Sequence, residues 1–219
     1  VFFMFGVTRA IVAAHFPTRA IGPNKRGVRI VPGFIEKKFG PEAEGRVWGA
    51  DAGKTKAEWV QLHQLVAAEG PPTLVRAPQF ILPPQGRGAA WTPLHATGVL
   101  LSPVGFIRGP ANEAEARELL RDVLSALAGL HAHGWVHRDV REPNVVRLTN
   151  GRWMLVDLEA AAPLRDGNWP ADGVVRDAWK PAPPAARWEP RHDVWQVANI
   201  IVPLMPVPLD FREALSSVS

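Results

Sequence analysis

The sequence predicts an α+β chain made of two lobes, the first rich in strands and the second mostly helical. Two observations predict this class. Short apolar runs broken by Gly and Pro occupy the first hundred residues, with a single helical pattern among them. Two further helical patterns then flank a hairpin in the second half. The 219 residues are enough to bury one sizeable core or two small packed lobes.

Strand patterns and one helix make up the first part of the chain. Apolar runs at 10–14 and 28–31 are typical of strands, and residues 74–82 and 96–105 show the same character on either side of a Gly/Pro loop. Residues 55–69 predict a helix that ends before Gly-Pro-Pro. Its apolar face consists of Trp59, Leu62, Leu65 and Val66.

The second part of the chain contains the strongest helical pattern, over residues 112–133, with acidic residues in its first turn. The apolar stripe of this helix consists of Leu119, Leu120, Val123, Leu127 and Leu130. Residues 158–192 are rich in Pro and Ala, which predicts an extended loop. A buried helix is expected over 193–205, with Asp193 as its N-cap and a break at Pro203.

A hairpin is predicted where Asn150-Gly151 lies between two apolar-rich flanks, because this dipeptide favours a two-residue turn. Pairing across such a turn places Asn144 opposite Asp157 at the open end, with Cβ atoms about 5 Å apart. A carboxylate beside a carboxamide oxygen suits Mg²⁺, with phosphate supplying further ligands. Asp139 lies on the loop that enters the hairpin and can reach the same place.

Composition and charge exclude several classes of function. The absence of Cys excludes disulfides, thiolate metal sites and cysteine nucleophiles. Residues 1–60 hold ten Lys or Arg against five acids, yet no basic run exceeds two residues, which favours a solvated surface or a site for a phosphorylated ligand over nucleic-acid binding. The apolar runs at 1–7 and 200–209 are too short to span a membrane. We therefore expect a soluble, cytoplasmic protein with no membrane partner.

The sequence His137-Arg138-Asp139, followed by Asn144 and thirteen residues later by Asp157, resembles the catalytic loop and metal-binding hairpin of protein kinases. The helix over 112–133 stands where kinases place the helix that leads into this loop. Asp193-Val194-Trp195 resembles the start of the large buried helix whose Asp braces the loop, and Leu100 to Gly105 resembles the last strand before the hinge between lobes.

This resemblance implies a protein-kinase-like fold with a small, β-rich N-lobe over residues 1–104 and a mainly helical C-lobe over 105–219. Because little sequence follows the helix at Asp193, the C-lobe is expected to be shortened. The chain also begins with Val1 rather than Met, so the resemblance is to a divergent or fragmentary kinase domain.

The resemblance implies ATP as a substrate and Mg²⁺ as a cofactor, and it assigns roles to four residues. Asp139 would accept or orient the proton of the attacking hydroxyl. Asn144 and Asp157 would hold Mg²⁺ on the phosphates of ATP. Arg141 stands where protein kinases often have Lys, and its guanidinium would neutralise the transferring phosphoryl group.

Kinases also pair a lysine on an N-lobe strand with a glutamate on a helix. Glu58 is the best glutamate, because it precedes the apolar face of the helix over 55–69. Lys37 and Lys38 both lie about twenty residues earlier. Strand alternation favours Lys37, which shares a face with Ile35 and Phe39. The alternative that both lysines are solvated surface charges stays open.

Departures from the kinase pattern keep three functions open. Asp157 is followed by Leu158-Glu159 where protein kinases have Phe-Gly, and this string resembles small-molecule kinases of the aminoglycoside phosphotransferase type. Glu159 either adds a carboxylate near the metal or is solvated. Residues 157–193 contain no Ser, Thr or Tyr and no Ala-Pro-Glu, which disfavours control by phosphorylation and weakens the case for a protein substrate.

The leading hypothesis is a Ser/Thr protein-kinase-like phosphotransferase acting on a hydroxyl. The alternatives are a small-molecule kinase and a pseudokinase or ATP-binding module.

Overall fold

The computed structural model describes residues 28–31, 33–38, 56–82, 92, 96–165 and 187–202. The strand predicted at 10–14 lies outside this range, as does everything after residue 202. The described elements are β1 Val28–Val31, β2 Phe34–Lys38, α3 Lys56–Glu69, β3 Arg76–Ile81, β4 Gly98–Ser102, α4 Glu113–Ala132, β5 Trp135–Val136, the 3₁₀ helix η4 Glu142–Asn144, β6 Val145–Arg147, β7 Trp153–Leu155, β8 Ala162–Pro163 and α5 Pro190–Ile201.

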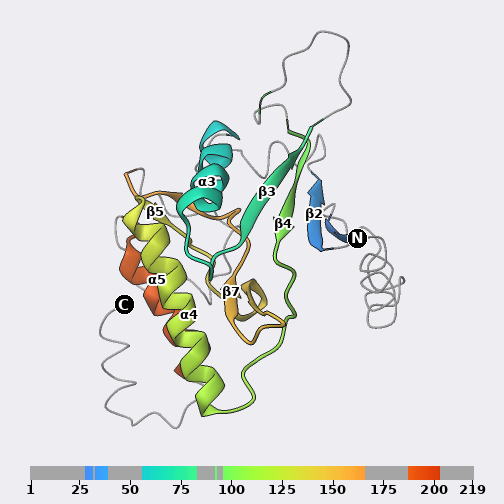
Figure 1. The fold of residues 1–219 in the computed structure, drawn as a ribbon. Helices are drawn as coiled ribbons and strands as arrows, with labels where there is room; N and C mark the ends of the chain where they lie inside the picture. Colours follow the sequence, from blue (N-terminus) through green and yellow to red (C-terminus); the bar gives the residue numbers. More distant parts are fainter. Residues whose placement is uncertain are drawn as a thin grey trace, which may run out of the picture.

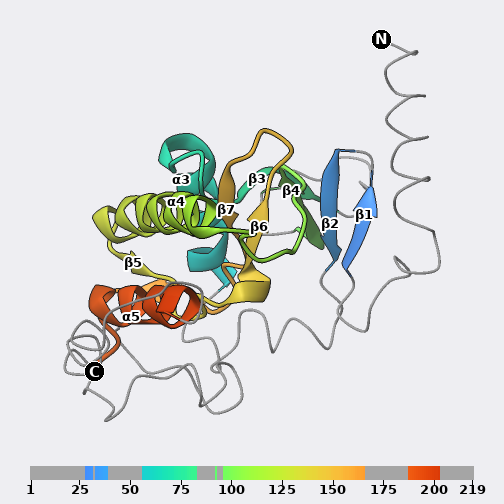
Figure 2. The same cartoon turned by 90° about the horizontal axis from the view of Figure 1, so that it is seen from below.

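A four-stranded antiparallel sheet has the order β1-β2-β4-β3 (Figures 1 and 2). The strands predicted within 28–31, 74–82 and 96–105 are therefore confirmed. In the inner strand β2, Lys37 lies opposite Val28 on one side and Val99 on the other. Its neighbours in the sheet are thus set by register, and its side chain projects from the middle of the sheet rather than from an edge.

The helices α3 and α4 bury the faces that their spacing predicts. On α3, Trp59, Leu62 and Val66 are buried, and Trp59 packs with Val99 of the sheet. At the start of α4, the Asn112 side chain accepts a hydrogen bond from the backbone N–H of the third helical residue, at 2.9 Å, which caps the helix. The predicted stripe of α4 is buried, apart from one partly buried leucine.

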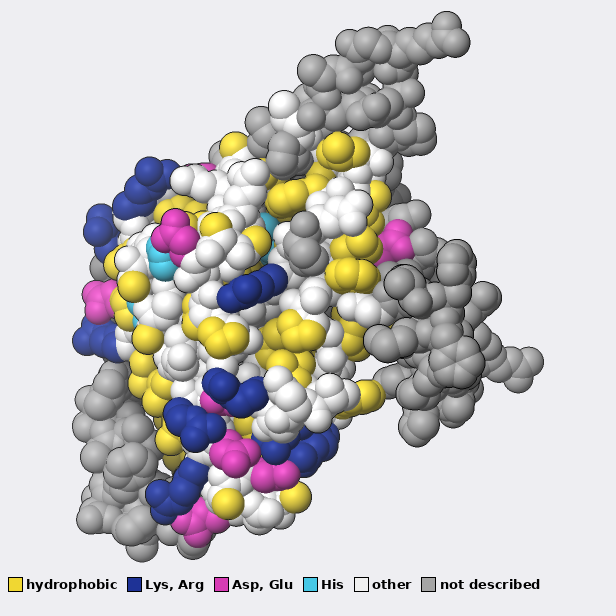
Figure 3. Space-filling view, viewed as in Figure 1, with side chains coloured by type: hydrophobic (Ala, Val, Ile, Leu, Met, Phe, Trp, Pro, Cys, Tyr) yellow, Lys and Arg dark blue, Asp and Glu magenta, His cyan; other side chains and the backbone are white. Residues whose placement is uncertain are grey.

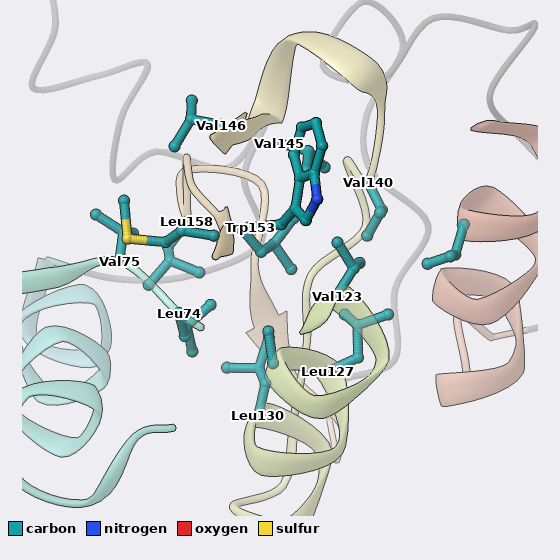
Figure 4. Packing of buried hydrophobic residues seen from close by; sticks show 14 of the residues in the cluster. Leu74, Val75, Val123, Leu127, Leu130, Val140, Val145, Val146, Trp153 and Leu158 are labelled. Carbon is teal, nitrogen blue, oxygen red and sulfur yellow. The ribbon is translucent and has the colours of Figure 1, made fainter. Parts of the chain in front are cut away.

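The largest core cluster joins α3, α4, α5 and the β6–β7 hairpin. Trp153 of β7 is fully buried and lies between Val145 of β6 and the leucine and valine side chains of α4 (Figure 4). Burying a side chain of this size contributes about 2–3 kcal/mol. The hairpin is therefore a central part of the core.

The hairpin differs from the prediction by one residue of register. Leu148 N–H donates to the Arg152 carbonyl at 2.8 Å, so the loop has three residues rather than two. Gly151 has a φ of +83°, the left-handed conformation that closes this kind of loop. As a result Asn144, whose carbonyl accepts from Val156 N–H at 2.8 Å, lies opposite Val156. The prediction that Asn144 directly faces Asp157 is wrong, and Asp157 lies one position further along.

Backbone hydrogen bonds tie the hairpin to the segment that precedes β3 and to the segment that follows β4, at one end of the sheet. Leu155 of β7 donates to the Thr73 carbonyl and accepts from Val75 N–H, at 2.8 and 2.9 Å. Arg147 of β6 exchanges two bonds of 2.8 Å with Phe106. The hairpin consequently lies between the four-stranded sheet and the helices α4 and α5 (Figure 2).

Two details of the second half differ from expectation. Helix α5 begins at Pro190, three residues early, and its cap is Glu189 with His192 in a reciprocal pair of hydrogen bonds. The prediction that Asp193 is the N-cap is therefore wrong, because Asp193 lies in the first turn and is fully buried. The short strands β5 and β8, paired at Trp135 opposite Pro163, were not predicted.

The described residues thus form small antiparallel sheets with three α-helices, a mixture of α and β structure that is compatible with the predicted kinase-like α+β class. Across these residues, every helix is too short or too polar to cross a membrane. The face around the N-terminal end of α4 carries charges of alternating sign (Figure 3), with Arg117 paired to Glu113 and Arg108 to Glu115. On that face the charges neutralise one another locally.

Candidate active site

The loop over 137–144 is braced by the carboxylate of Asp193 from α5. One oxygen accepts from the backbone N–H of His137 and the other from that of Arg138, both at 2.8 Å. His131 of α4 and Trp188 add side-chain donors at 2.8 and 2.9 Å. Burial alone would raise the pKa of Asp193, but these donors and the nearby imidazoles lower it below its ordinary value. The buried carboxylate therefore stays ionised and holds two consecutive backbone groups of the loop.

Arg138 adopts a left-handed conformation, with a φ of +69°, which is costly for a residue with a side chain. Gln196 of α5 holds the backbone on both sides of Asp139, accepting from Val140 N–H at 2.8 Å and donating to the Arg138 carbonyl at 3.0 Å. The Arg138 guanidinium is itself buried and donates to the Ala160 carbonyl at 2.5 Å. These contacts maintain the turn that places the buried Asp139 beside Arg141 and Asn144.

His137 links the loop to the hairpin. Its Nε2 lies 3.1 Å from the Val156 carbonyl, and its Nδ1 accepts from Asp139 N–H at 3.3 Å. Burial lowers the pKa of His137, so the ring is neutral and Nε2 carries the hydrogen. His137 is therefore a structural link between the loop and the hairpin.

The structure brings Asp139, Arg141 and Asn144 together. The Asn144 Nδ2 donates to both the carbonyl and the carboxylate of Asp139, at 2.8 and 2.7 Å. The Arg141 Nε lies 2.9 Å from the same carboxylate. Burial raises the pKa of Asp139, and the opposing charge of Arg141 does not fully offset it. A positioned carboxylate of raised pKa is suited to accept a proton from a hydroxyl.

Lys37 reaches across from β2 to the residues that follow β7. Its Nζ lies 3.4 Å from Asp157 Oδ1 and also forms an ion pair with Glu159. Burial raises the pKa of Asp157, but the Lys37 charge and the hydrogen bonds from Lys37 and the Glu159 backbone bring it below its ordinary value. For Lys37 the effect of burial, which lowers the pKa, is outweighed by the two carboxylates. Of the two candidate lysines, Lys37 therefore lies at this site, while the Lys38 side chain is outside the described residues.

Glu58 takes a different partner from the one that the resemblance implied. Its carboxylate accepts from Arg165 Nη2 at 3.0 Å, across 107 positions of sequence. Lys37 meets Asp157 and Glu159 instead. The sequence had left open whether Glu159 is solvated or part of the site. The sequence feature that indicated a place for Glu159 in the site was its position two residues after Asp157.

The donor atoms at this site fit Mg²⁺. The Asn144 Nδ2 donates to Asp139, so the carboxamide oxygen takes no part in those two bonds. Asp157 directly follows Val156, whose N–H donates to the Asn144 carbonyl. Within the described ranges, no three His, Cys, Asp or Glu side chains form a metal-binding cluster. One carboxylate and one carboxamide suit Mg²⁺, which keeps waters and takes substrate phosphates as ligands. Such a site differs from one in which the protein supplies every metal ligand.

Comparisons with known proteins point in the same direction over short stretches. A protein of Oryza sativa subsp. japonica whose name includes cyclin-dependent kinase F-2 is 31% identical over 100 residues, which are 44% of this chain and 31% of that protein. The chloroplastic serine/threonine-protein kinase STN8 of Arabidopsis thaliana is 39% identical over 51 residues, 23% of this chain and 10% of STN8. Crinkler effector protein 8 of Phytophthora infestans is 40% identical over 63 residues, 28% of this chain and 10% of that protein.

No family model matches the chain. The chain also spans about a third or less of the length of these curated relatives. The matches to the two proteins named as kinases give weak support for a kinase-like relationship.

Proposed function

We propose that this chain transfers the γ-phosphate of ATP to a hydroxyl group, as a Mg²⁺-dependent, Ser/Thr protein-kinase-like phosphotransferase. The single observation that supports it most is the convergence of Asp139, Asn144, Asp157 and Lys37 from three separate parts of the chain. A base, a metal-binding pair and a cation are the groups that phosphoryl transfer requires. The short kinase matches point to the same broad class.

In this proposal the protein contributes position and charge more than covalent chemistry. Asp139 accepts the hydroxyl proton at its carboxylate, which Asn144 and Arg141 hold in place. Lys37 binds phosphate oxygens, and Arg141 offsets charge on the group in transit. Asn144 and Asp157 hold Mg²⁺, which neutralises the phosphates when bound.

A small-molecule kinase is the second candidate, and Glu159 is the observation that favours it. Asp157-Leu158-Glu159 replaces the Asp-Phe-Gly of protein kinases, and residues 157–193 lack the Ala-Pro-Glu of a peptide-docking platform. The same scaffold can host either substrate. Phosphorylation of a generic basic protein compared with a panel of aminoglycosides and other hydroxylated small molecules would distinguish them.

Replacing Asp139 with Asn tests the proposed reaction. We expect ATP turnover to fall by about 10²–10⁴-fold, because the amide cannot accept the hydroxyl proton. Affinity for Mg²⁺-ATP should change little, since Asp139 does not hold the phosphates. Turnover is measured with radiolabelled ATP, and binding by isothermal titration calorimetry. A native chain that binds Mg²⁺-ATP but turns over no faster than Asp139→Asn would be a pseudokinase. A folded native chain with no binding would contradict the proposal.

A further inference from the structure

Glu159 is directed back toward the sheet by a turn that begins at Asp157. Asp157 has a φ of +68°, a left-handed conformation that Asp tolerates better than most residues. Its carboxylate accepts a hydrogen bond from the backbone N–H of Glu159, two residues later, the pattern of an Asx turn. Leu158 between them is buried in the core, which anchors the turn. The local backbone thus favours one direction for the Glu159 side chain.

The turn places two carboxylates on one ammonium group. Lys37 Nζ contacts Asp157 and Glu159 together, and 86% of its side chain is removed from solvent, against 69% for Glu159. The helix glutamate, Glu58, is meanwhile engaged by Arg165. Lys37 therefore has its counter-ions on the segment after β7.

We propose that Glu159 is the positioning residue for Lys37, holding its ammonium group toward the phosphates of ATP in the role that the resemblance assigned to Glu58. This inference rests on the proposed function. Once Asp157 is engaged by Mg²⁺, it is no longer fully available to Lys37, and Glu159 remains as the partner. A lysine side chain has about 2 kcal/mol of rotamer entropy, so a fixed counter-ion limits the cost of ordering it on the nucleotide.

A double-mutant cycle between Lys37 and Glu159 tests this role. The variants are Lys37→Met, Glu159→Gln and the double variant, with Mg²⁺ and a non-hydrolysable ATP analogue titrated by calorimetry. We expect Glu159→Gln to weaken nucleotide affinity by about five- to tenfold, and Glu159→Asp to restore part of that loss. In the Lys37→Met background, Glu159→Gln should change affinity by less than about twofold, because the residue acts through the lysine.

The same cycle by urea denaturation without nucleotide provides a readout that does not depend on ATP. We expect Lys37 and Glu159 to be coupled by about two- to fivefold in the folding equilibrium constant, as for a partly exposed ion pair. Glu113→Gln removes a matched carboxylate from the surface of α4 and should leave nucleotide affinity within about twofold of the native value.

The outcomes separate this inference from the proposed function. A native chain that fails to bind the nucleotide overturns the proposed function, and the inference with it. A native chain that binds, with equal losses from Glu159→Gln in the presence and absence of Lys37, overturns the inference alone. The inference alone is also overturned if the double-mutant cycle couples Lys37 more strongly to Glu58 than to Glu159.

Discussion

The two sides of the candidate site are held by different kinds of contact. The loop with Asp139 is fastened by the fully buried Asp193 and Gln196, whose hydrogen bonds reach the backbone of His137, Arg138 and Val140. Lys37, on the other side, meets its partners through ion pairs whose carboxylates are about a quarter to a third exposed.

The difference shows which half of the site is part of the folded core. Removing a buried carboxylate that accepts several hydrogen bonds leaves its donors without a partner and away from water. When a partly exposed ion-pair partner is removed, water can take its place. We therefore expect the base and its loop to be in place whenever the protein is folded. The position of the lysine should depend on a few side chains and on the bound ligand.

The largest effect is expected from Asp193→Asn, which should lower the free energy of unfolding by about 3–5 kcal/mol. The amide would present an N–H group to donors from the loop, α4 and Trp188. Urea denaturation at pH 7 measures the change. A loss below about 1 kcal/mol would remove the contrast between the two sides of the site.

The pH dependence of that loss sharpens the same point. Because folding lowers the pKa of Asp193, its stabilising effect is fully present above the unfolded pKa of about 3.9 and is lost as pH falls through the lower folded value. The native chain and Asp193→Asn should therefore differ by a constant amount at neutral pH and converge in acid below about pH 4. A difference that grows as the pH falls would contradict the assignment.

An intermediate effect is expected from Gln196→Met, which keeps the size of the side chain but removes both hydrogen bonds to the loop. Val140 N–H and the Arg138 carbonyl would lose these two hydrogen bonds, at a cost of about 1–3 kcal/mol. Hydrogen exchange should show the Val140 amide losing protection while amides in the middle of α4 retain theirs. Unchanged protection at Val140 would mean that other contacts hold the loop.

The smallest effect on stability is expected from Lys37→Met without nucleotide, about 1 kcal/mol or less, because its ion pairs are partly exposed. Urea denaturation beside Asp193→Asn gives the comparison directly. Equal losses in the two variants would show that Lys37 is as much a part of the core as Asp193 is.

The parts of the fold that were predicted correctly depend on local patterns. Helices α3 and α4 follow from apolar residues at helical spacing. The hairpin register was missed because a Gly in the left-handed conformation fits both two- and three-residue loops. The β5–β8 pair was missed because two-residue strands, with the whole β6–β7 hairpin between them, leave almost no pattern in the sequence.

The sequence by itself determined which residues could carry the chemistry. The positions of Asp139, Asn144 and Asp157 around a hairpin could be predicted from their spacing, because turn and strand preferences act over a few residues. Only the tertiary structure decided which charges meet: Lys37 with Asp157 and Glu159, and Glu58 with Arg165. Those pairs join residues more than a hundred positions apart, and such contacts are set by how the sheet, the hairpin and the helices pack together, which no local pattern records.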